Sequence, residues 1–286
     1  MRLISAYVSL TKPRIIALLL ITTVTAMMVA SRGFPPPALV LVTLIGGALS
    51  AGAANTFNCC LDRDIDALMT RTATRPLVSG AIKPNQALAF GGALALLSVL
   101  DLGLLVNWLA AALSVCGLLY YVLVYTCWLK RAMPSNIVIG GAAGAVPPLV
   151  GWAAVTGELS LVAAYLFAVI FLWTPPHFWA LALLIRPEHE RAKVPMLPVV
   201  RGERETRRQV LVYSVILVLF TLGILAFRQV GIFYAAAALV LGGVFVYHAL
   251  RLWHEATSDA ARRLFRYSIL YLALLFTALV IDQWKW

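Results

Sequence analysis

The sequence predicts an all-α, polytopic membrane protein, and three observations support this fold class. Of the 286 residues, 62% are hydrophobic and 12% are charged, and the mean hydropathy is +0.90, whereas soluble domains carry about twice that share of charge. The apolar runs reach the roughly 20 residues that a helix needs to cross a bilayer. They are continuous, whereas a membrane β-barrel would show alternating segments of about ten residues.

No long linker rich in Pro or Ser divides the chain, so residues 1–286 are expected to form one membrane domain.

Nine apolar runs are long enough to span a membrane, and polar or basic segments follow most of them. Residues 32–37 follow the first run and residues 62–83 follow the second. Lys130 and Arg131 follow the fourth, residues 186–208 the sixth and residues 251–266 the eighth. The predicted spans are 14–31, 38–60, 85–106, 108–126, 135–155, 160–184, 209–227, 231–250 and 266–283.

The distribution of Lys and Arg predicts the orientation of the bundle. With nine spans and a cytoplasmic N-terminus, all but three of the 23 basic residues fall on the cytoplasmic side, the exceptions being Arg32, Arg228 and Lys285. Positive loops stay inside, so the N-terminus is predicted to be cytoplasmic and the C-terminus external. The net charge of +11 then reflects topology and attraction to anionic membrane lipid. No basic motif is interleaved with aromatic residues, and no nucleic-acid partner is expected.

The most informative motif lies at the predicted cytoplasmic end of the second span, in residues 58–66. It contains Asn58, Asp62 and Asp66, each four residues from the next. On a helix this spacing places the three side chains on nearly one face, with their oxygens directed at one point. Mg²⁺ prefers oxygen ligands and is commonly shared between carboxylates and the phosphate oxygens of a substrate. The motif therefore predicts a Mg²⁺ site that binds a diphosphate, and carboxylates at such a depth usually mark a function.

Two charged loops are expected to complete this site. The first, residues 62–83, and the second, residues 186–208, each combine acids with bases beside a helix end. Acids can hold a metal, while Arg and Lys can neutralise the oxygens of a departing diphosphate. Most charges next to a membrane are topology signals, and a solvated loop is the simpler interpretation for Arg63, Asp64 and residues 201–208.

Residues 58–66, followed by Arg71 and Thr72, resemble the first Asp-rich motif of the UbiA-type intramembrane prenyltransferases, which transfer an isoprenoid from its diphosphate to an acceptor. Further segments resemble the branch of that family that farnesylates heme. The resemblance covers roughly residues 8 to 208, and the last three spans match only as apolar helices. The segments that carry it are Leu10-Thr11-Lys12-Pro13-Arg14, residues 125–131, 136–157 and 176–182, and Pro195 to Gly202.

The resemblance implies nine helices around a central cavity that opens to lipid, in a bacterial-type inner membrane. It implies farnesyl diphosphate and heme b as substrates, heme o as product, and a heme A synthase or terminal oxidase as a possible recipient. Mg²⁺ would be held by Asn58, Asp62 and Asp66. Heme would be a substrate rather than a cofactor. The implied cationic contacts of the diphosphate are Arg71, Lys130, Arg131 and Lys193.

The second acidic motif departs from the family pattern. Relatives that act on aromatic acceptors usually carry two Asp four residues apart, whereas Glu188 is followed at that spacing by Ala192. The heme branch usually keeps one acid, typically Asp, followed by Tyr; Glu188 and His189 stand in those places. The resemblance therefore implies a catalytic or metal-linked acid at Glu188, while Glu190 maps onto no family acid.

His177 follows Pro175 and Pro176 in the sixth span. A proline pair frees backbone carbonyls, so the imidazole can simply satisfy them. A heme cavity would equally benefit from an imidazole as an axial ligand, and heme contact is the second interpretation. Asp101 has no predicted partner, and His248 is expected at a membrane interface.

Two other functions fit parts of the sequence. A prenyltransferase for a small aromatic or quinone precursor would share the first acidic motif but should carry a second Asp pair. A transporter or heme-handling protein without chemistry should show inverted repeats or an intramembrane ion pathway, and neither is evident. Heme farnesylation is the favoured prediction.

Overall fold

The structure is a computed structural model that describes residues 3–223 and 230–283. Within these residues it contains helices and turns and no strand. Nine helical segments are long and apolar enough to cross a membrane, which confirms the predicted fold class and number of spans. They are α2 (Pro13–Ser31), α3 (Pro37–Leu61), α5 (Pro84–Leu105), α6 (Trp108–Leu119) continued by η1 (Tyr120–Leu129), α8 (Asn136–Thr156), α9 (Leu161–Leu184), α12 (Gly202–Gly223), α13 (Ile232–Glu255) and α14 (Ser258–Gln283).

Two spans begin earlier than predicted. The seventh begins at Gly202 instead of 209, and the ninth begins at Ser258 instead of 266. Charged first turns carry these helices beyond their apolar runs, with Arg207 3.5 Å from Glu203 and Arg262 3.3 Å from Asp259. Pairs at these spacings support a helix in water, so hydropathy alone places its start too late. The predicted end of the seventh span at 227, together with Arg2, Arg228 and Lys285, lies outside the described residues.

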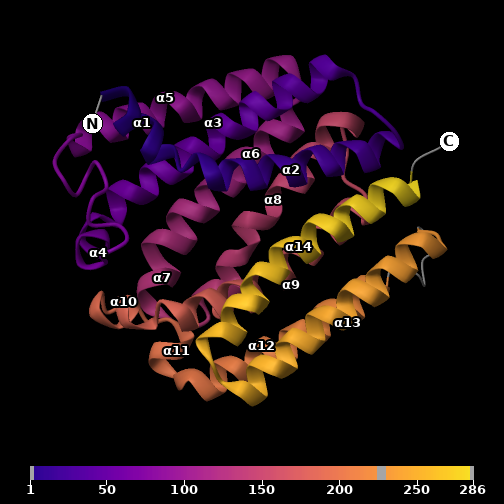
Figure 1. The fold of residues 1–286 in the computed structure, drawn as a ribbon. Helices are drawn as coiled ribbons and strands as arrows, with labels where there is room; N and C mark the ends of the chain where they lie inside the picture. The colour runs from indigo at the N-terminus through magenta and orange to yellow at the C-terminus, as the bar shows by residue number, and fades with distance from the viewer. Residues whose placement is uncertain (1–2, 224–229, 284–286) are drawn as a thin grey trace.

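Five short helices lie at the ends of the spans. In Figure 1, α4 lies at the end of α3, while α10 and α11 connect α9 to α12 near α7. Hydrophobic residues of both charged loops, among them Ile65, Met69, Val194 and Met196, are buried in the same apolar core as α9, α12, α13 and α14. The loops are therefore anchored to the bundle. The short helices are α1 (Leu3–Thr11), α4 (Arg63–Leu68), α7 (Lys130–Ala132), α10 (Arg186–Arg191) and α11 (Leu197–Val200).

Helix α8 joins the two sides of the bundle because it packs against both α2 and α9. At Gly151 an added Cβ would lie 2.3 Å from the backbone oxygen of Thr23. Only glycine allows the backbones of α2 and α8 to approach this closely. Pro147 and Pro148 lie inside the same helix, where each removes one backbone hydrogen bond.

The span that begins with α6 widens into the π-helical segment η1. Within it the Thr126 hydroxyl donates to the carbonyl of Tyr121, five residues earlier, at 2.9 Å. Thr126 is fully buried and faces the end of α3, where its Oγ1 accepts from Asn58 Nδ2 at 3.0 Å. π-Helical turns are often found at functional sites, and this one reaches the predicted acidic motif.

Candidate active site

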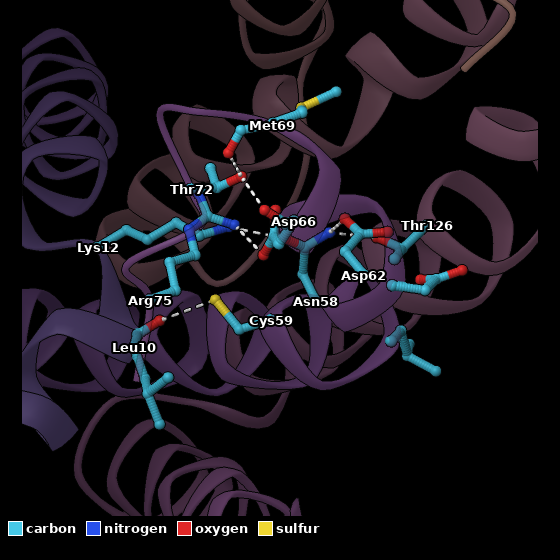
Figure 2. A network of polar contacts seen from close by, with 12 residues as sticks. Leu10, Lys12, Asn58, Cys59, Asp62, Asp66, Met69, Thr72, Arg75 and Thr126 are labelled. Atoms are coloured by element: carbon cyan, nitrogen blue, oxygen red, sulfur yellow. Dashed lines mark hydrogen bonds and ion pairs between the residues drawn. The ribbon is translucent and has the colours of Figure 1, made fainter. Parts of the chain in front are cut away.

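The first acidic motif is buried where α3 ends. Asn58, Asp62 and Asp66 are only 3%, 1% and 3% exposed. The helix is interrupted at Asp62, yet the amide of Asp62 donates to the Asn58 carbonyl at 2.9 Å and that of Asp66 to the Asp62 carbonyl at 2.7 Å. These two backbone bonds keep the helical spacing across Asp62, so the three side chains lie together at the end of α3 (Figure 2).

Basic side chains neutralise both buried carboxylates. Lys130 Nζ lies 2.5 Å from Asp62 Oδ2, and Arg75 NH1 lies 2.5 Å from Asp66 Oδ2. Asn58 Nδ2 also donates to Asp62 Oδ2, at 2.7 Å. A buried charge without such partners would cost several kcal/mol. The end of α3 is therefore a compact network in which acids and bases alternate.

Lys12 belongs to this network, a role that the sequence does not indicate directly. Its Nζ donates to Asn58 Oδ1 at 2.7 Å. Its backbone is left-handed, with φ 55°, immediately before Pro13 at the start of α2. Burial, reinforced by nearby Arg75 and Lys130, lowers the pKa of Lys12 to about 8. The sequence gives two indirect signals: this lysine stands directly before the first proline of a span, and residues 10–14 are one of the segments that resemble the family.

Arg131 forms a separate pair at the rim of the network. Its guanidinium donates to both oxygens of Asp64 at 2.7 Å and to the carbonyl of Leu61 at 2.7 Å. Its NH2 is 3.7 Å from Asp62 Oδ1. The hydrogen bond from Arg131 lowers the pKa of the exposed Asp64 to about 2. Asp64 is therefore paired rather than simply solvated, and Arg131 stabilises the end of α3 as well as facing Asp62.

The second loop lies against the first through His189 and Arg191. His189 is 4% exposed, and burial together with Lys130 and Arg71 lowers its pKa to about 4, so its imidazole is neutral at physiological pH. Arg191 reaches across to Thr70, with NH1 to Oγ1 at 3.3 Å. Glu188 Oε2 and His189 Nδ1 are buried, and neither has a hydrogen-bond partner in the part of the chain that the structure describes.

The structure does not draw every predicted cation into the network. Arg71 and Lys193 are exposed, and no side-chain contact of either with the acidic motif is present among residues 3–223 and 230–283. Lys193 has a left-handed backbone with φ 52°. Glu190 is exposed as well. The roles of Arg71, Lys193 and Glu188 stay predictions.

His177 lies in α9, away from the acidic network. Its ring stacks between Trp173 and Phe265, with centroid distances of 4.1 and 4.7 Å. Its Nδ1 is 2.6 Å from the hydroxyl of Ser268 in α14. The ring therefore bonds a side chain of another span, and heme contact through its other nitrogen stays a prediction. The ring of His248 lies edge-on to that of Tyr247 and tilted against that of Tyr267, with centroid distances of 5.6 and 5.1 Å.

The oxygens at the end of α3 fit a hard cation in their chemistry. Asp62 Oδ1 is buried and has no hydrogen-bond partner among the described residues, and Asp66 and Asn58 supply further oxygens. Mg²⁺ selects such a donor set. Nowhere in the described residues do three His, Cys, Asp or Glu side chains gather as a metal site of their own. A cation here would rely on the amide oxygen of Asn58 or on substrate oxygens.

An apolar pocket begins one helical turn from Asn58. It runs between α2, α3, α6 and α8, from Asn55 and Tyr121 to Gly47 and Val150, and holds about 180 Å³. Its lining is mostly aliphatic, as an isoprenoid chain requires. Sites for small molecules are typically about 300–1,000 Å³, so this pocket is too small for a prenyl chain and a large acceptor together.

Comparison with known proteins identifies the family. The model of the UbiA prenyltransferase family matches residues 19–277. The chain belongs to the UbiA prenyltransferase family. This UbiA prenyltransferase is 52% identical to a protein of Gloeothece citriformis over 99% of the chain and 88% of the relative, and 55% identical to one of Symbiobacterium thermophilum over 96% and 93%. Both relatives are named protoheme IX farnesyltransferase.

Solved structures share the fold of this UbiA prenyltransferase. A digeranylgeranylglyceryl phosphate synthase superposes with a TM-score of 0.81 at 19% identity, covering 99% of both chains. A UbiA homolog from Archaeoglobus fulgidus, bound to GPP and Mg²⁺, gives a TM-score of 0.69 at 17% identity, covering 96% of this chain and 99% of the other. These likenesses establish a multi-pass membrane fold.

Asp101 is a polar residue with no place in this site. Its Oδ2 is buried against Gly46 of α3, where an added Cβ would lie 2.5 Å from it, and no hydrogen-bond partner for this oxygen occurs in the described part of the chain. The feature lies at the close contact between α3 and α5. We find no catalytic reason for it.

Proposed function

We propose that this UbiA prenyltransferase transfers a farnesyl group from farnesyl diphosphate to a vinyl group of heme b, with addition of water, giving heme o. The observation that carries the proposal is the buried network of Asn58, Asp62 and Lys130 beside an apolar pocket. The names of relatives at 52–55% identity over nearly the whole chain support heme as the acceptor. Because both relatives carry the name protoheme IX farnesyltransferase, heme is preferred to a quinone precursor as the acceptor.

The basic side chains of the network bind and orient the diphosphate. Lys12, Arg75 and Lys130 approach the end of α3 from three different segments. When a diphosphate binds, they can transfer part of their hydrogen bonding from the acids to its oxygens. These fixed cations then stabilise the negative charge that develops on the leaving diphosphate. Such electrostatic stabilisation is usually the largest catalytic contribution of a site of this kind. Mg²⁺ held by Asn58, Asp62 and Asp66 would supply Lewis-acid stabilisation of the same leaving group.

The apolar pocket is proposed to hold the isoprenoid chain and keep water from it. The bond between the first farnesyl carbon and the diphosphate oxygen breaks, and diphosphate leaves with the electron pair. The terminal vinyl carbon of heme bonds to the farnesyl carbon, and the remaining positive charge is quenched by water, which adds a hydroxyl and releases a proton. The aliphatic wall around Ala51 and Val146 limits attack by water on the farnesyl group itself.

The distribution of basic residues supports a cytoplasmic N-terminus, and with it an active site on the cytoplasmic side of a bacterial inner membrane. Farnesyl diphosphate would then enter from the cytoplasm and heme from the lipid phase. Membrane lipid is a further partner on this account. A heme A synthase or terminal oxidase would then receive the product, heme o.

A product assay tests the proposal. Purified protein in detergent is incubated with heme b, farnesyl diphosphate and Mg²⁺, and the hemes are separated and weighed by mass spectrometry. We expect a heme that is heavier by a farnesyl group and a hydroxyl, lost in Asp62→Ala and retained in Asp64→Ala, because Asp64 is exposed and Asp62 is buried in the network. Prenylation of an added aromatic acid, with heme unchanged, would overturn the choice of acceptor.

A further inference from the structure

The contact between His177 and Ser268 bears on which nitrogen of the imidazole carries hydrogen. The Ser268 hydroxyl lies 2.7 Å from the backbone carbonyl of Phe265 and donates to it. A hydroxyl has a single hydrogen, and a carbonyl has none to give. While the hydroxyl hydrogen is directed at Phe265, Nδ1 of His177, 2.6 Å from the same oxygen, is left to donate. The neutral imidazole is then protonated on Nδ1 and carries a lone pair on Nε2.

Surrounding contacts hold this arrangement in place. Trp173 Nε1 donates to the backbone carbonyl of Ser268 at 2.7 Å, so the residue that stacks on His177 also fixes the residue that binds it. Phe265 covers the opposite face of the imidazole. With both faces covered and Nδ1 bonded, the ring can neither rotate nor flip without breaking several contacts. Ser268 is fully buried, so water cannot readily replace its hydroxyl.

We propose that Ser268 is a positioning residue that fixes His177 as the Nδ1–H tautomer and presents its Nε2 to the iron of the heme acceptor. This inference rests on the proposed function, since it takes heme b as a substrate. His177 is only partly buried, and no partner for Nε2 occurs within residues 3–223 and 230–283. Neutral imidazole nitrogen is a common metal ligand, and its other nitrogen normally donates to an oxygen that sets its orientation.

Location supports a role with the acceptor rather than with the diphosphate. The pocket proposed for the isoprenoid lies between α2, α3, α6 and α8, and its volume leaves no room for a second large substrate. His177 and Ser268 lie on α9 and α14, outside that lining. Helix α8 packs against both α2 and α9, so the two sites lie on either side of it.

Titration of ferric heme b into the purified full-length protein, followed by visible absorption, tests this inference. We expect Ser268→Ala to raise the Kd for heme about ten- to a hundredfold, the range found when residues that orient a metal-bound imidazole are removed. Ser268→Thr keeps the hydroxyl and should restore most of the affinity. Ser214→Ala is the matched control, because Ser214 is equally buried in α12 and bonds only its own helix, at Val210.

Steady-state kinetics and NMR separate positioning from a structural role. Ser268→Ala should raise KM for heme while leaving KM for farnesyl diphosphate within twofold. Equal increases in both constants, or heme affinity unchanged from the wild type, would overturn the inference. If Ser268→Ala does not fold, ¹⁵N-histidine NMR of the wild type decides, with His177→Gln to assign the signal: hydrogen on Nε2 contradicts the inference. Wild-type protein that shows the Nδ1–H tautomer but makes no farnesylated heme would instead contradict the proposed function.

Discussion

Replacement of Lys130 by methionine tests whether the buried network is held together by its charges. The variant leaves the carboxylate of Asp62, which is 1% exposed, without the ammonium now 2.5 Å away. Asp62 keeps Asn58 Nδ2 at 2.7 Å and Arg131 at 3.7 Å. Loss of one charged hydrogen bond costs about 1.5–3 kcal/mol, below the roughly 3–5 kcal/mol for a carboxylate stripped of all partners.

That loss corresponds to a fall in Tm of about 3–6 °C for a chain of this size. Apparent Tm in one detergent can be measured for Lys130→Met, Asp62→Asn and the double variant. Because the double variant has no unpaired buried charge, we expect it to recover more than half of the loss. Lys193→Met serves as the stability control, since Lys193 is exposed. A Tm of Lys130→Met equal to that of the wild type, or a double variant less stable than Lys130→Met, would refute the reasoning.

Three further predictions concern the same site and its walls. Arg75→Gln removes the ion pair with Asp66 and should lower kcat/KM for farnesyl diphosphate about a hundredfold; undiminished kcat/KM would exclude a role with the diphosphate. Gly151→Ala places a methyl group 2.3 Å from the Thr23 carbonyl oxygen and should lower the free energy of unfolding by about 1–3 kcal/mol, which is measured as loss of folded protein on heating. Gly144→Ala is the control and should be tolerated, because there is open space around Gly144. Gly144→Leu fills the apolar pocket and should shift the ratio of kcat/KM for geranyl over farnesyl diphosphate about tenfold toward the shorter donor; an unchanged ratio would place the isoprenoid elsewhere.

Local spacing explains how much of the site could be predicted. Asn58, Asp62 and Asp66 share one helical period, so their convergence follows from the sequence. The nine spans follow equally from hydropathy, apart from helix starts where charged turns continue beyond the membrane. These properties depend only on residues a few positions apart.

Contacts between distant helices could not be predicted in the same way. The partner of Asn58 is Lys12, 46 residues away, and that of Asp62 is Lys130, 68 residues away. Helix packing decides which base reaches which acid, and nothing in the loop composition distinguishes Lys130 from the exposed Lys193. The bond from His177 to Ser268 spans 91 residues and links α9 to a span that the family motifs do not cover.

Stoichiometry of the reaction in ¹⁸O-labelled water tests the central claim most directly. We expect one diphosphate released for each farnesylated heme, one ¹⁸O atom in the new hydroxyl group, and loss of both products in Asp62→Asn but not in Asp64→Asn. Diphosphate released without any heme product, with ¹⁸O found in farnesol instead, would contradict it.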